Sequence, residues 1–175
     1  MHSLLCLTHK SAADLVPGEL FRFALNSGAD GSLALMLGTN GDGDPLFGIL
    51  RSPEFETPLT WYEGSSTDRC VSYGTEWLLE ERPGPETAPG NAFQQDAKIR
   101  LFIDSGATVM RFTPPHGFVH QSINLDLTNT KIGSALSTRA APVANWAIWA
   151  SIDQYKSPRA EALFEYPPKA AASLG

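Results

Sequence analysis

The sequence has no long apolar run, few cysteines and no excess of basic charge, and each of these absences excludes a class of proteins. No stretch approaches the roughly 18 apolar residues that a membrane-spanning helix needs. The 13 basic residues are outnumbered by 19 acidic ones, and the net charge of -6 disfavours binding to nucleic acid or to anionic membranes. Because the amino end shows neither a basic leader nor a cleavage site, we expect a soluble, cytoplasmic protein.

The two cysteines, Cys6 and Cys70, are too few for a disulfide framework, and they are not spaced as a metal-binding pair. A reducing compartment is therefore expected, and a single bridge between the two stays open. The sequence also lacks a phosphate-binding glycine loop, a serine nucleophile elbow, a zinc-protease motif and a dinucleotide fingerprint. We expect no cofactor, and whether the protein is an enzyme stays open.

What the sequence does contain is alternation of apolar and polar residues. The odd positions of segment 71–81 include four large side chains: Val71, Tyr73, Trp77 and Leu79. The even positions between them are mostly polar: Ser72, Glu76 and Glu80. Because successive side chains of a strand point to opposite faces, the pattern predicts one half-buried strand with its odd positions in a core and its even positions in water.

Runs of strand length recur along the chain and are separated by segments rich in glycine and proline. The expected strands are 19–25, 33–37, 46–50, 59–62, 71–81, 98–104, 107–113 and 118–127. The runs 33–37 and 46–50 are apolar on both faces, which is typical of central strands. We predict an all-β fold, an antiparallel two-sheet sandwich or flattened barrel of about eight to ten strands, with at most one or two short helices.

The length of 175 residues suits one domain, which we expect at 1–166, followed by a flexible tail at 167–175. Segment 145–156 alternates like a strand but lies between helix start and stop signals, so both assignments stay open, with strand favoured. A last strand is expected within 160–166.

One expected hairpin has a definite register. A two-residue turn at 105–106 places Leu101 opposite Met110 on an apolar face. The same register places Arg100 opposite Arg111, and two like charges in that arrangement are unfavourable unless an anion or an acidic neighbour lies between them. The pair is therefore a candidate anion-binding site. The alternative is that both guanidinium groups reach into water and bind separate carboxylates.

The strand that leads into this turn carries a motif with a catalytic association. Segment 101–108 reads Leu-Phe-Ile-Asp-Ser-Gly-Ala-Thr, and these eight residues resemble the active-site segment of retroviral-type aspartic proteases. In that family two subunits each contribute an Asp, and the paired carboxylates share a proton. The resemblance implies that Asp104 is the catalytic residue of a dimeric hydrolase. The alternative is an ordinary hairpin turn, because Asp, Ser and Gly favour turns.

His116 and His120 are a second candidate for chemistry. The two prolines that precede them exclude a helix, so we expect a strand, on which both side chains share one face. At about 3.3 Å per residue the two lie roughly 13 Å apart, too far to bind one metal ion unless the backbone bulges at Gly117. We expect no metal and a polar strand face in water, with a metal-dependent or His-based enzyme as the alternative.

Trp61 and Trp77, together with Tyr62 and Tyr73, would form an aromatic platform for a sugar or a peptide if their rings were exposed. Large aromatic side chains are more often part of a core, and we favour that position for them.

These observations favour a binding or assembly module, for a protein or a small ligand, over an enzyme. The long loops 82–91 and 128–144 are expected contact surfaces, because binding groups concentrate in loops held by a rigid scaffold. A homo-oligomer is also expected, since all-β chains must protect their edge strands and symmetric dimers are common.

Overall fold

Antiparallel strands make up about half of the described residues and are by far the main secondary structure, which confirms the predicted all-β fold. The computed structural model describes residues 7–24, 31–54, 58–83, 99–115, 121–133 and 135–167. Within these ranges it has three antiparallel sheets, one short 3-10 turn, η1 (Ala12–Asp14), and one short helix, α2 (Ile152–Lys156). There are three sheets where the sequence predicts two, and four more strands than the upper end of the expected range.

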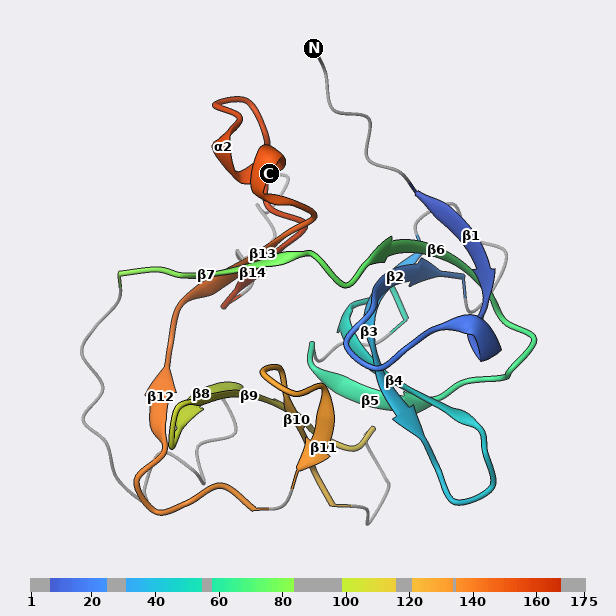
Figure 1. Ribbon diagram of the computed structural model, residues 1–175, viewed down its shortest axis with the longest axis horizontal. Helices are drawn as coiled ribbons and strands as arrows, with labels where there is room; N and C mark the ends of the chain where they lie inside the picture. Colours follow the sequence, from blue (N-terminus) through green and yellow to red (C-terminus); the bar gives the residue numbers. More distant parts are fainter. Residues whose placement is uncertain are drawn as a thin grey trace, which may run out of the picture.

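The largest sheet has six strands in the order β1-β6-β2-β3-β4-β5 (Figure 1). They are β1 (Thr8–Ser11), β2 (Leu20–Phe23), β3 (Ser32–Thr39), β4 (Pro45–Arg51), β5 (Thr60–Glu63) and β6 (Arg69–Gly74). The central strands β3 and β4 are buried on both faces over most of their length, as their continuous apolar runs predict.

The second sheet has five strands in the order β11-β10-β9-β8-β12. They are β8 (Leu101–Asp104), β9 (Ala107–Phe112), β10 (Ile123–Asp126), β11 (Lys131–Gly133) and β12 (Ala141–Val143). The pairing of Leu101 with Met110 confirms the predicted hairpin register. Its turn residues Ser105 and Gly106 have φ values of 51° and 86°, the left-handed pair that a two-residue hairpin turn requires.

The third sheet has the order β14-β13-β7, and it corrects the prediction for segment 71–81. Its strands are β7 (Leu78–Glu81), β13 (Trp146–Trp149) and β14 (Phe164–Tyr166). The predicted single strand is two strands, because Gly74 has a φ of 83° and ends β6 before β7 begins in another sheet. Tyr73, Trp77 and Leu79 nevertheless pack against the same core, as their alternation predicts.

Segment 145–156 contains both of the structures that the sequence left open. Strand β13 comes first, and α2 follows it, with the Ser151 hydroxyl accepting a hydrogen bond from the Gln154 N–H at the start of the helix. Strands β1, β11 and β12 were not expected from the sequence, and two of them lie in the predicted loop 128–144.

The main hydrophobic core lies where the three sheets meet. Its buried members come from strands of every sheet and include Leu20, Leu35, Phe112, Leu125 and Trp146. A short parallel bridge between Thr60 and Thr113 joins the first two sheets beside this core.

A second core covers the other face of the six-stranded sheet. Phe47 contacts Phe21 and Phe23 edge-on, with ring centroids 4.9 and 5.0 Å apart. The turn η1 closes this core with Ala12. Ser72, which the alternation places in water, is 2% exposed because β6 is covered on this face as well.

No helix in the described ranges is long and apolar enough to cross a membrane, since α2 has five residues.

Candidate functional site

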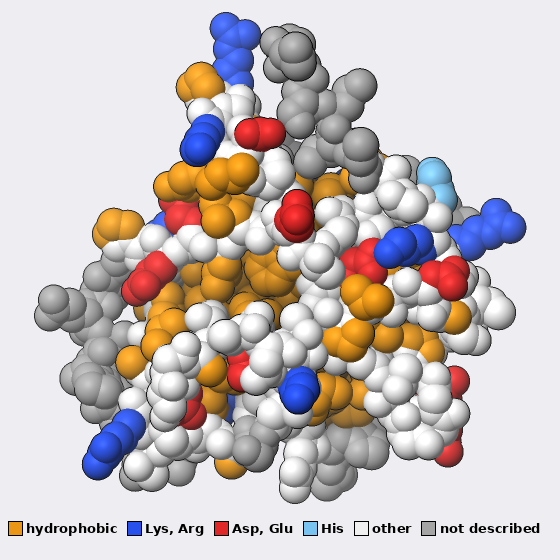
Figure 2. Space-filling model, in the orientation of Figure 1, with side chains coloured by type: hydrophobic (Ala, Val, Ile, Leu, Met, Phe, Trp, Pro, Cys, Tyr) orange, Lys and Arg blue, Asp and Glu red, His pale blue; other side chains and the backbone are white. Residues whose placement is uncertain are grey.

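The main core is open on one face of the molecule. Figure 2 shows hydrophobic side chains gathered in a hollow at the middle of this face, between the positions that β7, β13 and β14 occupy in Figure 1 and those of β10 and β11. The half-buried hydrophobic side chains that pack against this core are Tyr73, Trp77, Leu79, Ile123, Leu127, Leu163 and Tyr166. All three sheets or their connections contribute to this set. We take it as the lining of the hollow, and we call hollow and lining together the apolar recess.

Hydrogen bonds and ring stacking hold the recess side chains in place. The Trp77 indole N–H donates to the Gly18 carbonyl at 2.8 Å, which fastens the β6–β7 connection to the turn before β2. Tyr166 stacks on Trp146 with a centroid distance of 5.3 Å and an interplanar angle of 21°. The Leu163 N–H donates to the Ile148 carbonyl at 2.8 Å. The lining is therefore preorganised, which lowers the entropy cost of binding a ligand.

Two buried side-chain nitrogens in the described residues have no hydrogen-bond partner: Arg22 Nε and Trp146 Nε1. Arg22 and Leu20 are two residues apart on β2, so both side chains lie on the main-core side of the sheet. Its guanidinium lies over the ring of Tyr73, 5.8 Å from the centroid. An unpaired buried donor costs about 1–3 kcal/mol. Trp146 is 0% exposed, so of the two side chains only the half-buried Arg22 is open to a ligand that brings a hydrogen-bond acceptor.

The aromatic residues of the predicted platform do not share one surface. Trp61 is 9% exposed and belongs to the main core, and its indole N–H donates to the Gln121 carbonyl at 3.2 Å. Tyr62, the next residue on β5, packs against the second core instead. Tyr73 and Trp77 are half-buried and belong to the recess, so the four rings do not form one exposed platform.

Arg100 and Arg111 lie on the face of the second sheet that turns away from the main core. The Arg111 N–H donates to the Arg100 carbonyl at 2.7 Å, as the predicted register requires. Arg100 is 6% exposed, so it does not reach into water. The Arg111 guanidinium lies over the Phe102 ring and donates to Asn124 Oδ1 at 3.3 Å. Burial and then the charge of Arg100 lower the pKa of Arg111. The anion site at this pair stays a prediction.

The Asp104 carboxylate binds the loop that precedes β12. It accepts hydrogen bonds from the Ser137 hydroxyl and from the Ser137 N–H, the latter at 2.7 Å, and from the Ser105 hydroxyl at 3.2 Å. These bonds, led by that of the Ser137 hydroxyl, lower the pKa of Asp104. A structural role therefore accounts for the carboxylate in a single chain, and the dimeric hydrolase stays a prediction.

His116 and His120 lie outside the described residues, and the structure places neither. Among the residues that it does describe, no group of three or more His, Cys, Asp or Glu side chains is arranged to hold a metal ion.

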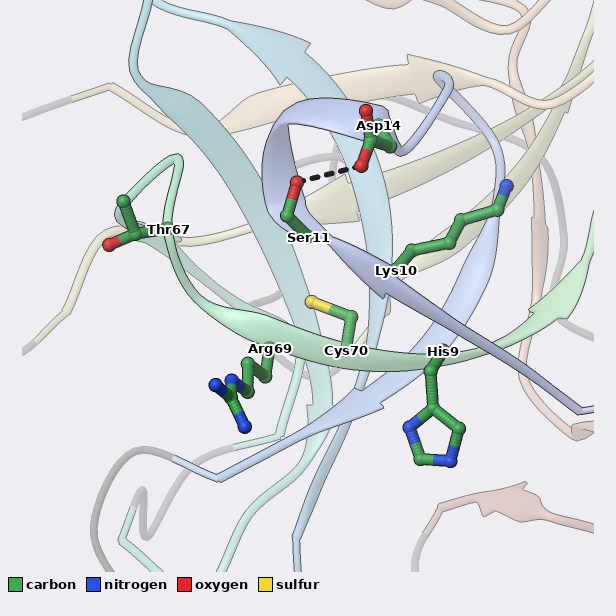
Figure 3. Close-up of a pocket in the computed structure, with 7 residues that line it drawn as sticks. All are labelled: His9, Lys10, Ser11, Asp14, Thr67, Arg69 and Cys70. Carbon is green, nitrogen blue, oxygen red and sulfur yellow. Dashed lines mark hydrogen bonds between the residues drawn. The ribbon is translucent and has the colours of Figure 1, made fainter.

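A second hollow, of about 490 Å³, lies at the edge formed by β1 and β6 (Figure 3). Its lining residues are His9, Lys10, Ser11, Asp14, Thr67, Arg69 and Cys70. Its polar groups are largely engaged with protein partners: the Lys10 ammonium donates to Glu19 at 2.6 Å, and the Ser11 hydroxyl donates to Asp14 at 2.8 Å. In Figure 3 the Cys70 thiol and the His9 ring point to opposite sides of the paired strands β1 and β6, as the strand register requires. The hollow therefore brings together no nucleophile and base.

Cys70 is a buried free thiol, and we expect it to be unreactive in the folded protein. Burial, reinforced by the negative charges of Asp68 and Glu19, raises its pKa to about 12. In a Cys6→Ser variant, alkylation by iodoacetamide at pH 8 should be at least about 100-fold slower in the native chain than in urea, because the thiolate is the reacting species. Equal rates in the two conditions would contradict the buried position.

Comparisons with protein-family models, curated proteins and solved structures found no match to this chain.

Proposed function

We propose that this protein is a binding module that takes a small ligand with an apolar body in the recess. The observation that carries the proposal is the open main core, where seven large hydrophobic side chains from three sheets remain half-buried. Ligand sites are typically concave, mostly apolar and supplied with a few polar groups that orient the ligand. The recess has these features, and the charged Arg22 lies beside its Tyr73.

A binding role is favoured over a catalytic one by the state of the described reactive groups. The thiol of Cys70 is buried and protonated, the ammonium of Lys10 is paired with Glu19, and the carboxylate of Asp104 accepts bonds from Ser137. Each of these contacts fixes the fold. An enzyme based on His116 and His120 remains the alternative prediction.

The proposal is tested with a neutral fluorescent probe, N-phenyl-1-naphthylamine, which emits strongly in apolar surroundings. We expect saturable binding to the wild-type chain. Leu127→Lys and Leu163→Lys place a charge on opposite sides of the recess and should each weaken binding about tenfold or more, because a buried unpaired ammonium is unfavourable.

The matched control is Ile152→Lys, which adds the same charge at a side chain that is 46% exposed on α2. This variant should bind the probe like the wild type. Thermal melts of all four proteins establish that they are folded. Probe binding that does not saturate, or that both recess variants retain at full strength, would rule out the recess as a ligand site.

A further inference from the structure

We propose that the recess ligand is an amphipathic anion, with its charged head bound by Arg22 and its apolar chain lying over Tyr73 and the recess. This inference deepens the proposed function and rests on it. The juxtaposition that carries it is a guanidinium without a hydrogen-bond or ion-pair partner at the edge of an open apolar core.

Arg22 has an unusual position for a charged residue. It lies on β2, an inner strand of the largest sheet, and its side chain points to the main core. Its direct cross-strand neighbours are Leu33 and Val71. Neither of the two can pair with a guanidinium. Lys10 and Arg82 form ion pairs in the described part of the chain, and Arg22 takes part in none of these.

The residues paired with Arg22 across the sheet bring no negative charge. The row of directly paired residues across five strands reads His9, Val71, Arg22, Leu33 and Arg51. With strands about 4.8 Å apart, His9 and Arg51 each lie two strands, or about 10 Å, from Arg22 along the sheet. This row contains no carboxylate, although the chain as a whole has a net charge of -6. The local potential therefore favours an anion.

The contact with Tyr73 connects this charge to the recess. The guanidinium lies over the Tyr73 ring, and Tyr73 itself packs against the main core. Ring contact and partial burial remove water from the guanidinium, while Nε is left without an acceptor. The two terminal nitrogens of the planar guanidinium would each donate an N–H bond to a carboxylate at this place, the arrangement in which arginine binds anions most strongly. Its alkyl chain would then extend over Tyr73 into the recess.

The experiment compares two probes that differ only in the head group, decanoate and 1-decanol, by isothermal titration below their aggregation concentrations. We expect the wild type to bind decanoate at least about tenfold more tightly, as a charge-assisted hydrogen bond implies. Arg22→Met keeps an unbranched apolar side chain and should remove this preference. Binding of decanol and of the neutral naphthylamine should stay unchanged. Arg22→Lys should retain part of the preference.

The control is Arg159→Met, which removes the same charge from an exposed position beyond α2 and should keep the preference for decanoate. Equal affinity of the wild type for the two probes, or a preference that survives in Arg22→Met, overturns the role of Arg22 while the proposed function stands. Failure of the neutral naphthylamine to bind overturns the proposed function and this inference together. Thermal melts separate loss of binding from loss of folding, and Arg22→Lys provides the second variant if Arg22→Met does not fold.

Discussion

Replacing Gly48 with alanine is expected to destabilise the protein by about 2–3 kcal/mol, at the upper end of the usual range for overpacked cores. Gly48 lies on β4, and a Cβ atom there would meet Cε1 and Cζ of Phe112 at 2.5 Å and Cδ2 of Leu37 at 2.9 Å. Phe112 and Leu37 are 0% and 1% exposed, so neither side chain has room to move aside. The absence of a side chain at Gly48 allows the second sheet to pack closely on the first.

Thermal unfolding measures this effect, with an expected fall in Tm of roughly 4–12 °C for a chain of this size. Gly41→Ala is the control, because a Cβ atom at Gly41 would have nothing within 4 Å. In the Gly48→Ala background, Phe112→Leu should cost less stability than it does in the wild type, since the smaller side chain removes the clash. If the Tm of Gly48→Ala equals that of the wild type, the two sheets pack less tightly than described.

The parts of the fold that were predicted correctly depend on local chemistry. The hairpin between β8 and β9 follows from Ser105 and Gly106, because a two-residue turn fixes the pairing of every residue on both sides. The burial of β3 and β4 on both faces follows in the same way from their unbroken apolar runs.

The parts that were missed depend on tertiary contacts. The break at Gly74 moves β7 into another sheet, although the alternation continues through it without a visible change. Ser72 is buried because the sheet has a second core behind it, and a polar residue at an even position gives no sign of this. Strand β1 is short and polar, and it is a strand only because β6 pairs with it.

Two of the recess residues stand out in the sequence. Tyr73 and Trp77 were identified as large aromatic residues, but the recess also needs Leu127 and Leu163 from distant segments, and no local pattern brings these together. Arg22 did leave a signal in the sequence, since it is a charged residue between Phe21 and Phe23 in a strand that is apolar on its other positions. A charge at a core-side position of a strand marks a site of binding or of strain.

Replacing Glu19 with glutamine is expected to cost about 2–3 kcal/mol at neutral pH, the second large effect. Glu19 is 1% exposed. One of its oxygens accepts from the Lys10 ammonium at 2.6 Å and from the Ser72 hydroxyl, and the other accepts from the Val16 N–H at 2.9 Å. The carboxylate therefore joins β1, β6 and the turn before β2. An amide has one acceptor oxygen instead of two and carries no charge, so Lys10 would lose its opposite charge and one of the three donors would lose its acceptor.

The effect of Glu19→Gln should depend on pH, because the carboxylate stabilises the fold only while it is ionised. Burial alone would raise the pKa of Glu19, but the hydrogen bonds from Lys10, Ser72 and Val16 outweigh it and hold the pKa below its usual value of 4.5. A group whose pKa is lower in the folded chain than in the unfolded chain contributes its full stability at any pH above its unfolded-state pKa. It loses this contribution as the pH falls through its folded-state pKa. Urea unfolding of the wild type and Glu19→Gln should show a large difference in the free energy of unfolding at pH 7, and this difference should narrow below about pH 4.

Glu76→Gln, at an exposed carboxylate, is the control and should follow the wild type throughout. A difference between wild type and Glu19→Gln that is the same at pH 7 and pH 3 would mean that the charge of Glu19 does not hold these three elements together.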